Sequence, residues 1–563
     1  MGTRRHDGPA GAGRGGAGPD TAARALLARH EPPAGTGRRH RARRRGRDRP
    51  RPLACGRRRP AARRPRLPGH RRLPGTARDV PLLLSTQWVI SARRHRSTGD
   101  DVTNRGTTRR GVFSALAGAA AATTLPTEPA EAAERPFQAA ASSKPAQRPN
   151  ILFIFADDLG WADLSSYGSP DIKTPNLDRL ASSGVRFTQA YSGGAVCSPT
   201  RMSLYTGRYP GRLPGGLPEP IAAPSPTAGL PPEHPTLASL LKKAGYTTAM
   251  FGKWHNGFLP WFGPLRSGWD EFFGNYSGAV DYYSKITGQG VDLFEGETRV
   301  ESDEYYTDTL AHRAEAFLRR EHRAPWLLNL NFTSPHWPWE APGDRAVSAE
   351  ITARVRAGDT FALFHTDGGS LETYRKMVEN LDVRVGQVLS ALRQTGQEEN
   401  TLVIFSSDNG GERYSYQWPL TGTKASLNEG GIRVPTIVRW PARIHGGQVS
   451  HEPVVTPDWT ATLLEIAGAA PDPAYPLDGT SFAGYLLHGS PAPGHDLFWR
   501  TRQSRALRRG NWKYLRDTDT DQLFDLDHDP REQADLAQKH PDLVAELRAR
   551  WEELAATQLP YPS

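Results

Sequence analysis

The segment G-A-V-C-S-P-T-R at residues 194–201 holds Cys197, one of only two cysteines in a chain of 563 residues. The pair Ser198-Pro199 that follows is typical of a helix start, with serine at the cap and proline as the first helical residue. A thiol at the positive end of a helix can have a lowered pKa and act as a nucleophile. Arg201 comes one helical turn after Cys197, near the same face of the helix and beside the anion-binding position at the helix end. The alternative is a small buried hydrophobic residue, and composition alone does not separate the two.

A second group of residues offers oxygen ligands for a hard divalent cation. Asp157 and Asp158 are adjacent in A-D-D-L-G, and Asp408 and Asn409 are adjacent in S-D-N-G-G. Three carboxylates and one amide oxygen, with no thiolate or clustered histidine, favour Ca²⁺ or Mg²⁺ over zinc. Each pair also has a simpler explanation, because Asp-Asp can cap a helix and Asp-Asn-Gly is a common turn.

Apolar segments of the chain place these residues at strand ends. Four short apolar runs, each typical of a strand buried on both faces, are 150–155, 246–251, 326–332 and 401–406. Amphipathic helical stretches at 236–244 and 308–322 alternate with them, which indicates a mainly parallel sheet between helices. Polar residues follow every run, and after the second and third these include Lys253, His255 and His336. Because ligands gather beyond the carboxyl ends of parallel strands, this shared edge is the strongest sign of a catalytic site.

Several motifs containing these residues occur together and in a fixed order. They are C-S-P-T-R (197–201), A-D-D-L-G (156–160), L-Y-T-G-R (204–208), F-G-K-W-H (251–255), S-D-N-G-G (407–411), K-A-S-L-N-E-G-G-I-R-V-P (424–435), G-N-W-K-Y-L (510–515) and Q-L-F-D-L-D-H-D-P-R-E (522–532). The first is similar to the C-x-P-x-R signature whose cysteine is converted to Cα-formylglycine. Together the motifs resemble the sulfatase family of the alkaline-phosphatase-like superfamily, over about residues 148–560.

The resemblance implies a metal site and a modified nucleophile. Ca²⁺, with Mg²⁺ as the alternative, would be bound by Asp157, Asp158, Asp408 and Asn409. Cys197, converted to formylglycine by a formylglycine-generating enzyme, would react as the aldehyde hydrate, with Arg201 steadying its hydroxyls. The second hydroxyl of the hydrate, deprotonated by His255, would release sulfate and restore the aldehyde.

The resemblance also implies a ring of cations around the substrate. A sulfate monoester spreads negative charge over its oxygens, so catalysis needs positive charge around it and an in-line nucleophile. Lys253 and Lys424 would hold the sulfate oxygens. A protonated His336, which would sit by the leaving oxygen, or Lys424 would donate to the departing alcohol, and Asp408 would accept the proton of the nucleophile.

Three features of the sequence lie outside this set. Asn256 stands where the family usually has Leu after G-K-W-H, which puts only local packing in doubt. Ser277 in G-N-Y-S-G is the candidate for the family's serine hydrogen bond to formylglycine. The Trp- and Tyr-rich stretch 254–283 is interpreted as packing around the pocket rim, with a sugar-stacking platform as the alternative.

The N-terminal part has a composition of its own. Residues 1–101 hold 26 Arg, no Lys and seven acidic residues, whereas the whole chain carries a formal charge of +11. Such a segment cannot bury a core and is expected to be disordered. Three interpretations of residues 1–101 compete: a nucleic-acid-binding arm, a targeting leader, or translated sequence upstream of the true start. Residues 102–147, with Arg109-Arg110 before an Ala-rich stretch, resemble a twin-arginine export signal and linker, which favours the last explanation.

We therefore expect an α/β, alkaline-phosphatase-like catalytic domain at 148–490. A small C-terminal domain at 491–563 would carry an antiparallel sheet and a final helix at 540–556. The expected function is an exported sulfatase that is secreted, periplasmic or at the cell surface, acts on a sulfated small molecule or carbohydrate, and has no nucleic-acid partner and no stable membrane anchor. The alternatives are a phosphonate or phosphodiester hydrolase of the same superfamily and a nucleic-acid-binding protein that uses residues 1–101. Carbohydrate, aryl and alkyl sulfates all remain open as substrates.

Overall fold

A ten-stranded mixed sheet forms the centre of the structure, a computed structural model that describes residues 148–562. The expected Arg-rich segment and export signal therefore lie outside the described residues. In spatial order the strands are β13 (Gln448–Ser450), β2 (Val185–Phe187), β12 (Thr436–Arg439), β11 (Thr401–Ser407), β1 (Asn150–Ala156), β10 (Trp326–Asn331), β4 (Thr247–Gly252), β5 (Glu271–Gly274), β8 (Phe294–Glu295) and β9 (Thr298–Arg299). The four runs predicted as strands are the neighbouring strands β11, β1, β10 and β4.

The centre of the sheet is parallel, and its flanks contain both parallel and antiparallel pairs. Strand β1 pairs in parallel with β10 and β11, and β10 pairs in parallel with β4. Antiparallel pairs occur between β11 and β12, β12 and β2, β5 and β8, and β8 and β9. The carboxyl ends of the four central strands therefore lie at one edge, as predicted.

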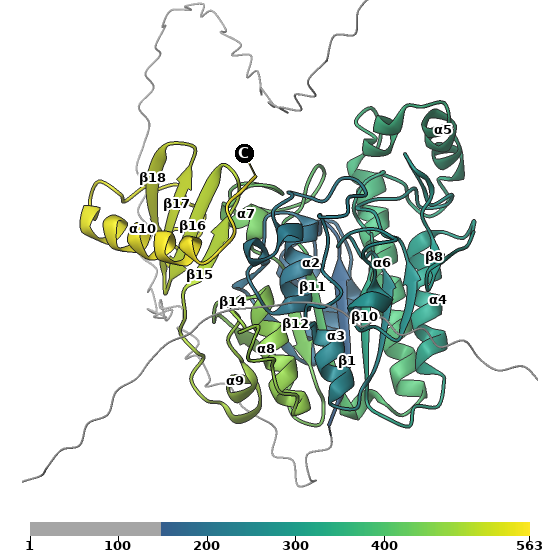
Figure 1. The fold of residues 1–563 in the computed structure, drawn as a ribbon, viewed down its shortest axis with the longest axis horizontal. Coiled ribbons are helices and arrows are strands. Elements are labelled where there is room, and N and C mark those ends of the chain that lie inside the picture. Colours follow the sequence, from purple (N-terminus) through teal and green to yellow (C-terminus); the bar gives the residue numbers. More distant parts are fainter. Residues whose placement is uncertain (1–147, 563) are drawn as a thin grey trace, which may run out of the picture. The chain divides into compact units, whose positions relative to one another are not determined.

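Helices cover both faces of the sheet (Figure 1). On one face lie α1 (Pro175–Ser182), α4 (Tyr306–Leu318) and α6 (Leu371–Gln394), and on the other lie α2 (Cys197–Thr206), α3 (Leu237–Lys243) and α8 (Thr456–Ala467). Successive side chains of a strand point to opposite faces. Leu152 and Ile154 of β1 accordingly pack with the first group, whereas Ile151 and Phe153 pack with the second. Burial on both faces explains why β1 is apolar throughout.

The start of α2 differs from the prediction. The helix begins at Cys197 with Val196 as its cap, so Ser198 is not the capping residue. The Oγ atom of Ser198 instead accepts a hydrogen bond from the backbone N–H of Ile221, at 2.9 Å. Pro199 occupies the third helical position, which it tolerates because the first four N–H groups of a helix have no intrahelical acceptor.

Shorter elements surround this frame. They are β3 (Ala190–Tyr191), β14 (Val454–Val455), β6 (Ile286–Thr287), β7 (Gly290–Val291), α5 (Arg345–Arg356), α7 (Glu429–Ile432), α9 (Ala483–His488) and the 3-10 helix η5 (Thr360–Phe364). The further 3-10 turns are η1 (Ser165–Tyr167), η2 (Pro210–Arg212), η3 (Pro214–Gly216), η4 (Pro264–Ser267) and η6 (Glu398–Asn400). Among the residues from 148 to 562, no helix has the length and apolarity needed to cross a bilayer.

The C-terminal domain has the expected antiparallel sheet and final helix. Its strands are β15 (Leu497–Arg500), β16 (Ser504–Arg509), β17 (Trp512–Asp517) and β18 (Thr520–Asp525), and each pairs with the next along the chain. Helix α10 (Pro541–Ala556) packs Leu547 and Trp551 against Tyr514 and Leu523 of the sheet.

Candidate active site

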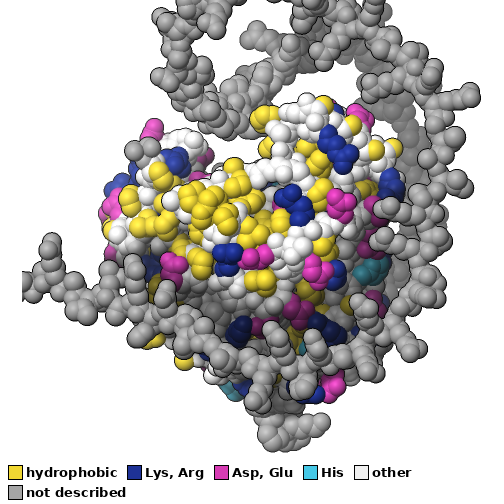
Figure 2. All heavy atoms as spheres, turned by 45° about the vertical axis from the view of Figure 1, so that its right-hand side comes forward, with side chains coloured by type: hydrophobic (Ala, Val, Ile, Leu, Met, Phe, Trp, Pro, Cys, Tyr) yellow, Lys and Arg dark blue, Asp and Glu magenta, His cyan; other side chains and the backbone are white. Residues whose placement is uncertain are grey.

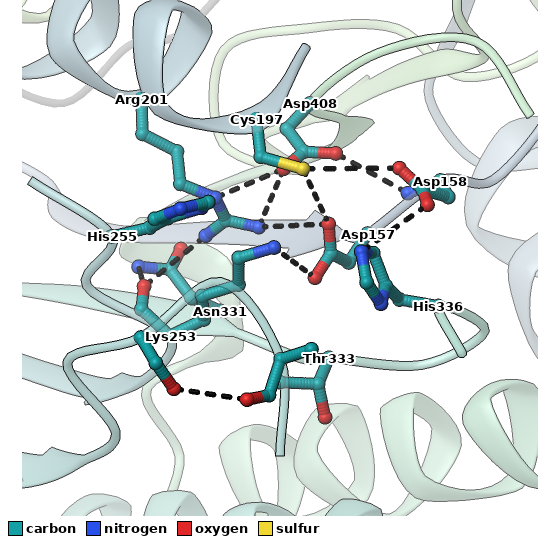
Figure 3. Close-up of polar contacts among 12 residues, drawn as sticks. Asp157, Asp158, Cys197, Arg201, Lys253, His255, Asn331, Thr333, His336 and Asp408 are labelled. Carbon is teal, nitrogen blue, oxygen red and sulfur yellow. Dashed lines mark hydrogen bonds and ion pairs between the residues drawn. The ribbon is translucent and has the colours of Figure 1, made fainter. Parts of the chain in front are cut away.

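The residues predicted to form a site meet at the carboxyl edge of the central strands (Figure 3). Asp157 and Asp158 follow β1, Asp408 and Asn409 follow β11, and all four are buried. Lys253 and His255 follow β4, and His336 comes five residues after β10. The first residue of α2, Cys197, faces these side chains. The geometry thus brings together groups that are 251 residues apart in the chain, such as Asp158 and Asn409.

Each of three carboxylates of the site has a cation within 3 Å, and Arg201 also lies 3.7 Å from Oδ1 of Asp157. The three ion pairs are Lys253 Nζ–Asp157 Oδ2 (2.6 Å), Lys424 Nζ–Asp158 Oδ2 (2.6 Å) and Arg201 Nη2–Asp408 Oδ2 (2.8 Å). Burial opposes ionisation of Asp408, yet the adjacent Arg201 guanidinium holds its pKa below the usual value. The side chain of Lys424 is 14% exposed, whereas those of Lys253 and Arg201 are fully buried.

The same carboxylates can hold a divalent cation. Ligand atoms of Asp157, Asp158, Cys197 and His336 lie within 4.8 Å of one another. The Oδ1 atom of Asn409 is buried and has no hydrogen-bond partner among the described residues. Burial and the neighbouring Asp408 raise the pKa of Asp157 to about 8, so further positive charge near Asp157 would favour its ionised form. An oxygen-rich set with an unpartnered amide oxygen fits Ca²⁺ or Mg²⁺.

Cys197 is placed as a buried partner of the carboxylates rather than as a reactive thiol. Its Sγ lies 3.4 Å from Oδ1 of Asp157 and 3.9 Å from Oδ1 of Asp158. Burial and the charge of Asp408 raise the pKa of the thiol well above its usual value. The expectation that the helix end lowers this pKa is therefore wrong, because desolvation and nearby carboxylates outweigh the helix terminus.

His255 is held by a loop from a distant part of the chain. Its Nε2 lies 2.9 Å from the carbonyl oxygen of Ile221, which can only accept, so Nε2 carries the proton. The Nδ1 atom is buried and has no hydrogen-bond partner within residues 148–562, so it is able to accept a proton. Burial and Lys253 lower the pKa of His255 well below its usual value. His255 is thus a neutral imidazole with one basic nitrogen in the site.

His336 is oriented in a similar way. Its Nδ1 lies 2.7 Å from the carbonyl oxygen of Trp337, and its Nε2 lies 3.5 Å from Oδ2 of Asp158. Burial and Lys424 lower the pKa of His336 well below its usual value. This direction does not support the expected protonated His336.

The backbone at the site adopts uncommon conformations. Asp158, His255 and Ala425 have φ values of 62°, 52° and 73°. A non-glycine residue in this left-handed region costs roughly 1 kcal/mol or more, and such residues cluster at functional sites. Gly252, at the end of β4, has a φ of +108°, and a Cβ there would lie 1.8 Å from the carbonyl oxygen of Asn331. Only glycine at position 252 therefore allows β4 to end this close to β10, with Lys253 as the next residue.

Comparison with known proteins identifies the family of this chain. The family model "Sulfatase" matches residues 149–469. N-acetylgalactosamine-6-sulfatase of Rattus norvegicus is 32% identical over 393 residues, which cover 65% of this chain and 71% of the relative. The chain belongs to the sulfatase family. A second model, for the C-terminal region of N-sulphoglucosamine sulphohydrolase, matches residues 423–557 of this sulfatase.

Further relatives support the same conclusion. Arylsulfatase A of Homo sapiens is 33% identical over 392 residues, covering 65% of this chain and 75% of the relative. The crystal structure of Ps i-CgsB superposes with a TM-score of 0.66 at 30% identity, covering 74% of this chain and 94% of that chain, and the same values hold for its complex with k-i-k-neocarrahexaose. This sulfatase is therefore a sulfuric ester hydrolase, as the sequence motifs indicated.

Some residues that shape the sulfatase site were not predicted. Asn331 donates from Nδ2 to the carbonyl oxygen of Lys253 at 3.1 Å, and Tyr282 donates its hydroxyl to the carbonyl oxygen of His336 at 2.8 Å. The polar Asn331 inside an apolar strand was a signal in the sequence, since such a residue needs a buried partner. Ile221 carried no such signal, because its contribution is a backbone carbonyl.

Three minor predictions concern residues that follow β4 and β5. Asn256 donates from Nδ2 to the carbonyl oxygen of Trp254 at 3.0 Å, a contact within its own turn. Ser277 donates its hydroxyl to the carbonyl oxygen of Ala279 at 2.9 Å, which does not support a bond to residue 197. The aromatic residues of the stretch 254–283 are mostly buried, in agreement with packing around the site.

Proposed function

We propose that this sulfatase cleaves sulfate monoesters with residue 197 as a formylglycine hydrate beside a bound Ca²⁺, with Mg²⁺ as the alternative. The observation that carries the proposal is the position of Cys197. Its sulfur is buried against Asp157, and its pKa is raised, so the unmodified thiol is a poor nucleophile where the site needs one. A hydroxyl of the hydrate at the same position can act as the nucleophile without formation of a thiolate.

The described side chains would have different roles in the reaction. Lys253 and Lys424 bind the sulfate oxygens, and Arg201 orients the hydroxyls of residue 197. The unprotonated Nδ1 of His255 accepts the proton of the second hydroxyl, since Ile221 holds the proton of the ring on Nε2. Burial opposes the charge of Lys424, but Asp158 raises its pKa, so Lys424 carries a proton that His336, whose pKa is lowered, does not hold; Lys424 would therefore bring the proton to the leaving alcohol.

Four residues of the site would hold the metal. These are Asp157, Asp158, Asp408 and Asn409, and when bound the metal supplies positive charge to the ester oxygens. In the protein itself, the three carboxylates are already matched by three buried or nearly buried cations. Asp408, held ionised by Arg201, is placed to take the proton of the attacking hydroxyl.

A sulfated carbohydrate is the substrate class we favour. One relative is an N-acetylgalactosamine-6-sulfatase, and one structural neighbour is solved with k-i-k-neocarrahexaose. We further propose that a formylglycine-generating enzyme modifies Cys197 and that the folded protein leaves the cytoplasm by twin-arginine export. The mature protein would then be secreted, periplasmic or at the cell surface.

Sulfate release from a panel of substrates tests this function. Purified protein, coexpressed with a formylglycine-generating enzyme, is assayed with 4-nitrophenyl sulfate and sulfated sugars, and with aryl phosphodiester and phosphonate esters of matched leaving group. Higher kcat/KM for sulfates supports the proposal. Higher kcat/KM for the phosphorus esters would replace it with the phosphodiester or phosphonate hydrolase.

A further inference from the structure

The exposure of the side chains around the site locates its mouth. Those of Asp157, Arg201 and Lys253 are fully buried, whereas Lys424 is 14% exposed and the neighbouring Glu412 is 40% exposed. The Nζ atom of Lys424 lies 3.9 Å from Oε2 of Glu412. Lys424 and Glu412 are therefore polar groups of the site that reach solvent.

A row of aromatic rings leads away from this mouth. The ring of Trp337 lies 4.2 Å from that of His336, centroid to centroid, and the ring of Phe364 lies 4.4 Å from that of Trp337. The Phe361 ring follows, stacked on Phe364 at 5.8 Å. Phe364 is 44% exposed and Phe361 is 70% exposed. The row thus runs from a buried imidazole to a ring that is open to solvent.

The outer rings, Phe361 and Phe364, remain exposed although their neighbours in the same 3-10 turn are buried. Within η5, Ala362 and Leu363 are buried in a cluster with Ile351 of α5. Phe361 and Phe364, on the other side of the same 3-10 turn, are among the large hydrophobic residues that remain exposed. Figure 2 shows a broad patch of exposed hydrophobic side chains on the face that it displays. An exposed apolar arrangement bordered by polar residues can mark a ligand-binding groove.

We propose that Trp337, Phe364 and Phe361 form a stacking platform for the saccharide ring that adjoins the sulfated residue of the substrate, with Glu412 as the hydrogen-bond partner of its hydroxyls. This inference rests on the proposed function and adds the residues that select the leaving group. A pyranose presents C–H groups on its face and hydroxyls on its edge, so it fits an aromatic surface bordered by a carboxylate.

Glu412 favours a saccharide over a plain aryl group. Its side chain is 40% exposed, with Oε2 beside Lys424 and the indole of Trp337 within hydrogen-bonding reach of the carboxyl group. A partly exposed carboxylate at this position can accept hydrogen bonds from a ligand. Sugar hydroxyls supply donors for such bonds, whereas a phenyl or naphthyl ring has none.

The test compares sulfate esters that differ in the group attached to the sulfated sugar, or that carry an aryl group in place of the sugar. The probes are sulfated monosaccharides, including N-acetylgalactosamine 6-sulfate, oligosaccharides that carry the same sulfated unit next to a further sugar, and 4-nitrophenyl and naphthyl sulfates. The double variant Phe361→Ala/Phe364→Ala should raise KM for the oligosaccharide about tenfold, equivalent to about 1.4 kcal/mol, because it removes the aromatic faces on which the sugar stacks. Its kcat/KM ratio of oligosaccharide to monosaccharide should fall by the same factor. Glu412→Gln should lower this ratio as well.

The control is Val449→Ala, which truncates a 46% exposed side chain on the edge strand β13 and should leave the ratio unchanged. Thermal unfolding of the double variant should match wild type, since both rings are exposed. An unchanged ratio in the double variant would overturn the platform. So would a wild-type enzyme that hydrolyses only aryl sulfates, with naphthyl sulfate impaired by Phe364→Ala. If no sulfate ester is hydrolysed by any form, the proposed function itself fails.

Discussion

The sulfur of Cys197 lies 3.4 Å from Oδ1 of Asp157, with both side chains buried. Two groups that both become negative on ionisation are thereby held together in a place that water does not reach. The position is unfavourable for a thiolate, and the pKa of the thiol rises accordingly. A neutral hydroxyl that donates a hydrogen bond to the carboxylate is a better occupant. This relationship motivates the first prediction.

Changing residue 197 should separate a modified nucleophile from a thiol. Cys197→Ala should abolish turnover, with a loss of at least about 10³-fold in kcat, because no nucleophile remains. Cys197→Ser offers a single hydroxyl and should release at most one alcohol per enzyme molecule. A burst experiment with an aryl sulfate measures this stoichiometry.

Intact-mass analysis provides the control for these variants. Active wild-type enzyme should have lost the sulfur of residue 197, and the unmodified fraction should be inactive. Full activity in protein that retains the thiol, or continued turnover by Cys197→Ser, would contradict the hydrate chemistry.

The second prediction concerns the metal. Ca²⁺ should raise the Tm of the protein and EDTA should lower it, because a ligand that binds only the folded state stabilises it, by about 2.7 kcal/mol at 100 times Kd. Asn409→Ala should remove most of the Ca²⁺-dependent rise in Tm. The matched control is Asn380→Ala on α6, whose Oδ1 is also buried without a partner in the described structure. An equal Ca²⁺ response in both variants would exclude Asn409 as a ligand.

The sequence identified residues that strand topology brings together. Asp157, Lys253 and Asp408 could be predicted because each directly follows an apolar run, and parallel strands end at the same edge. The motif order then indicated the family. These inferences needed only local patterns and a general rule of sheet architecture.

Features that depend on contacts between distant loops could not be predicted in this way. Ile221 reaches His255 through its backbone, and Glu412 meets Trp337 from a separate loop, so no periodicity marks either contact. The helix-start pattern at Ser198 was misleading because its hydroxyl bonds to Ile221 instead of the helix. The pKa of Cys197 was misjudged for a similar reason, since its burial depends on the whole fold.

The third prediction concerns a buried ionic cluster between the two domains. Lys513 of β17 donates to Glu429 at 2.9 Å and to Glu532 at 2.7 Å, and all three side chains are fully buried. Lys513→Met would leave Glu532 without its buried cation and Glu429 with only Arg433, at 3.3 Å, so the free energy of unfolding should fall by about 3–5 kcal/mol. Urea denaturation measures this change.

Lys376→Met is the control for this cluster, since Lys376 forms a largely exposed pair with Glu372. Exposed pairs contribute little, so this variant should unfold close to wild type. Equal stability of the Lys513 and Lys376 variants would show that Lys513 does not hold the domains together.

The fourth prediction is a pH dependence of stability that arises at His495. Its Nε2 lies 3.2 Å from Oδ2 of Asp458, a buried residue that also accepts from the backbone N–H groups of Val455 and Thr480. Burial opposes the charged imidazole, but the Asp458 carboxylate outweighs it and raises the pKa of His495 above 6.5. A group with a raised pKa in the folded state stabilises the protein fully below its unfolded pKa, and this contribution is lost as the pH rises through the folded-state pKa.

His495→Gln should therefore cost most stability below about pH 6.5, and the difference from wild type should shrink as the pH rises above that value. Urea denaturation of both proteins between pH 6 and pH 9 measures the free energy of unfolding across this window. His528→Gln serves as the control, because His528 forms a comparable pair with Asp525 but its side chain is 85% exposed. Solvent screens such a pair, so its removal should have little effect at any pH. A His495→Gln difference that stays constant, or grows toward alkaline pH, would show that the Asp458 carboxylate does not stabilise a charged imidazole here.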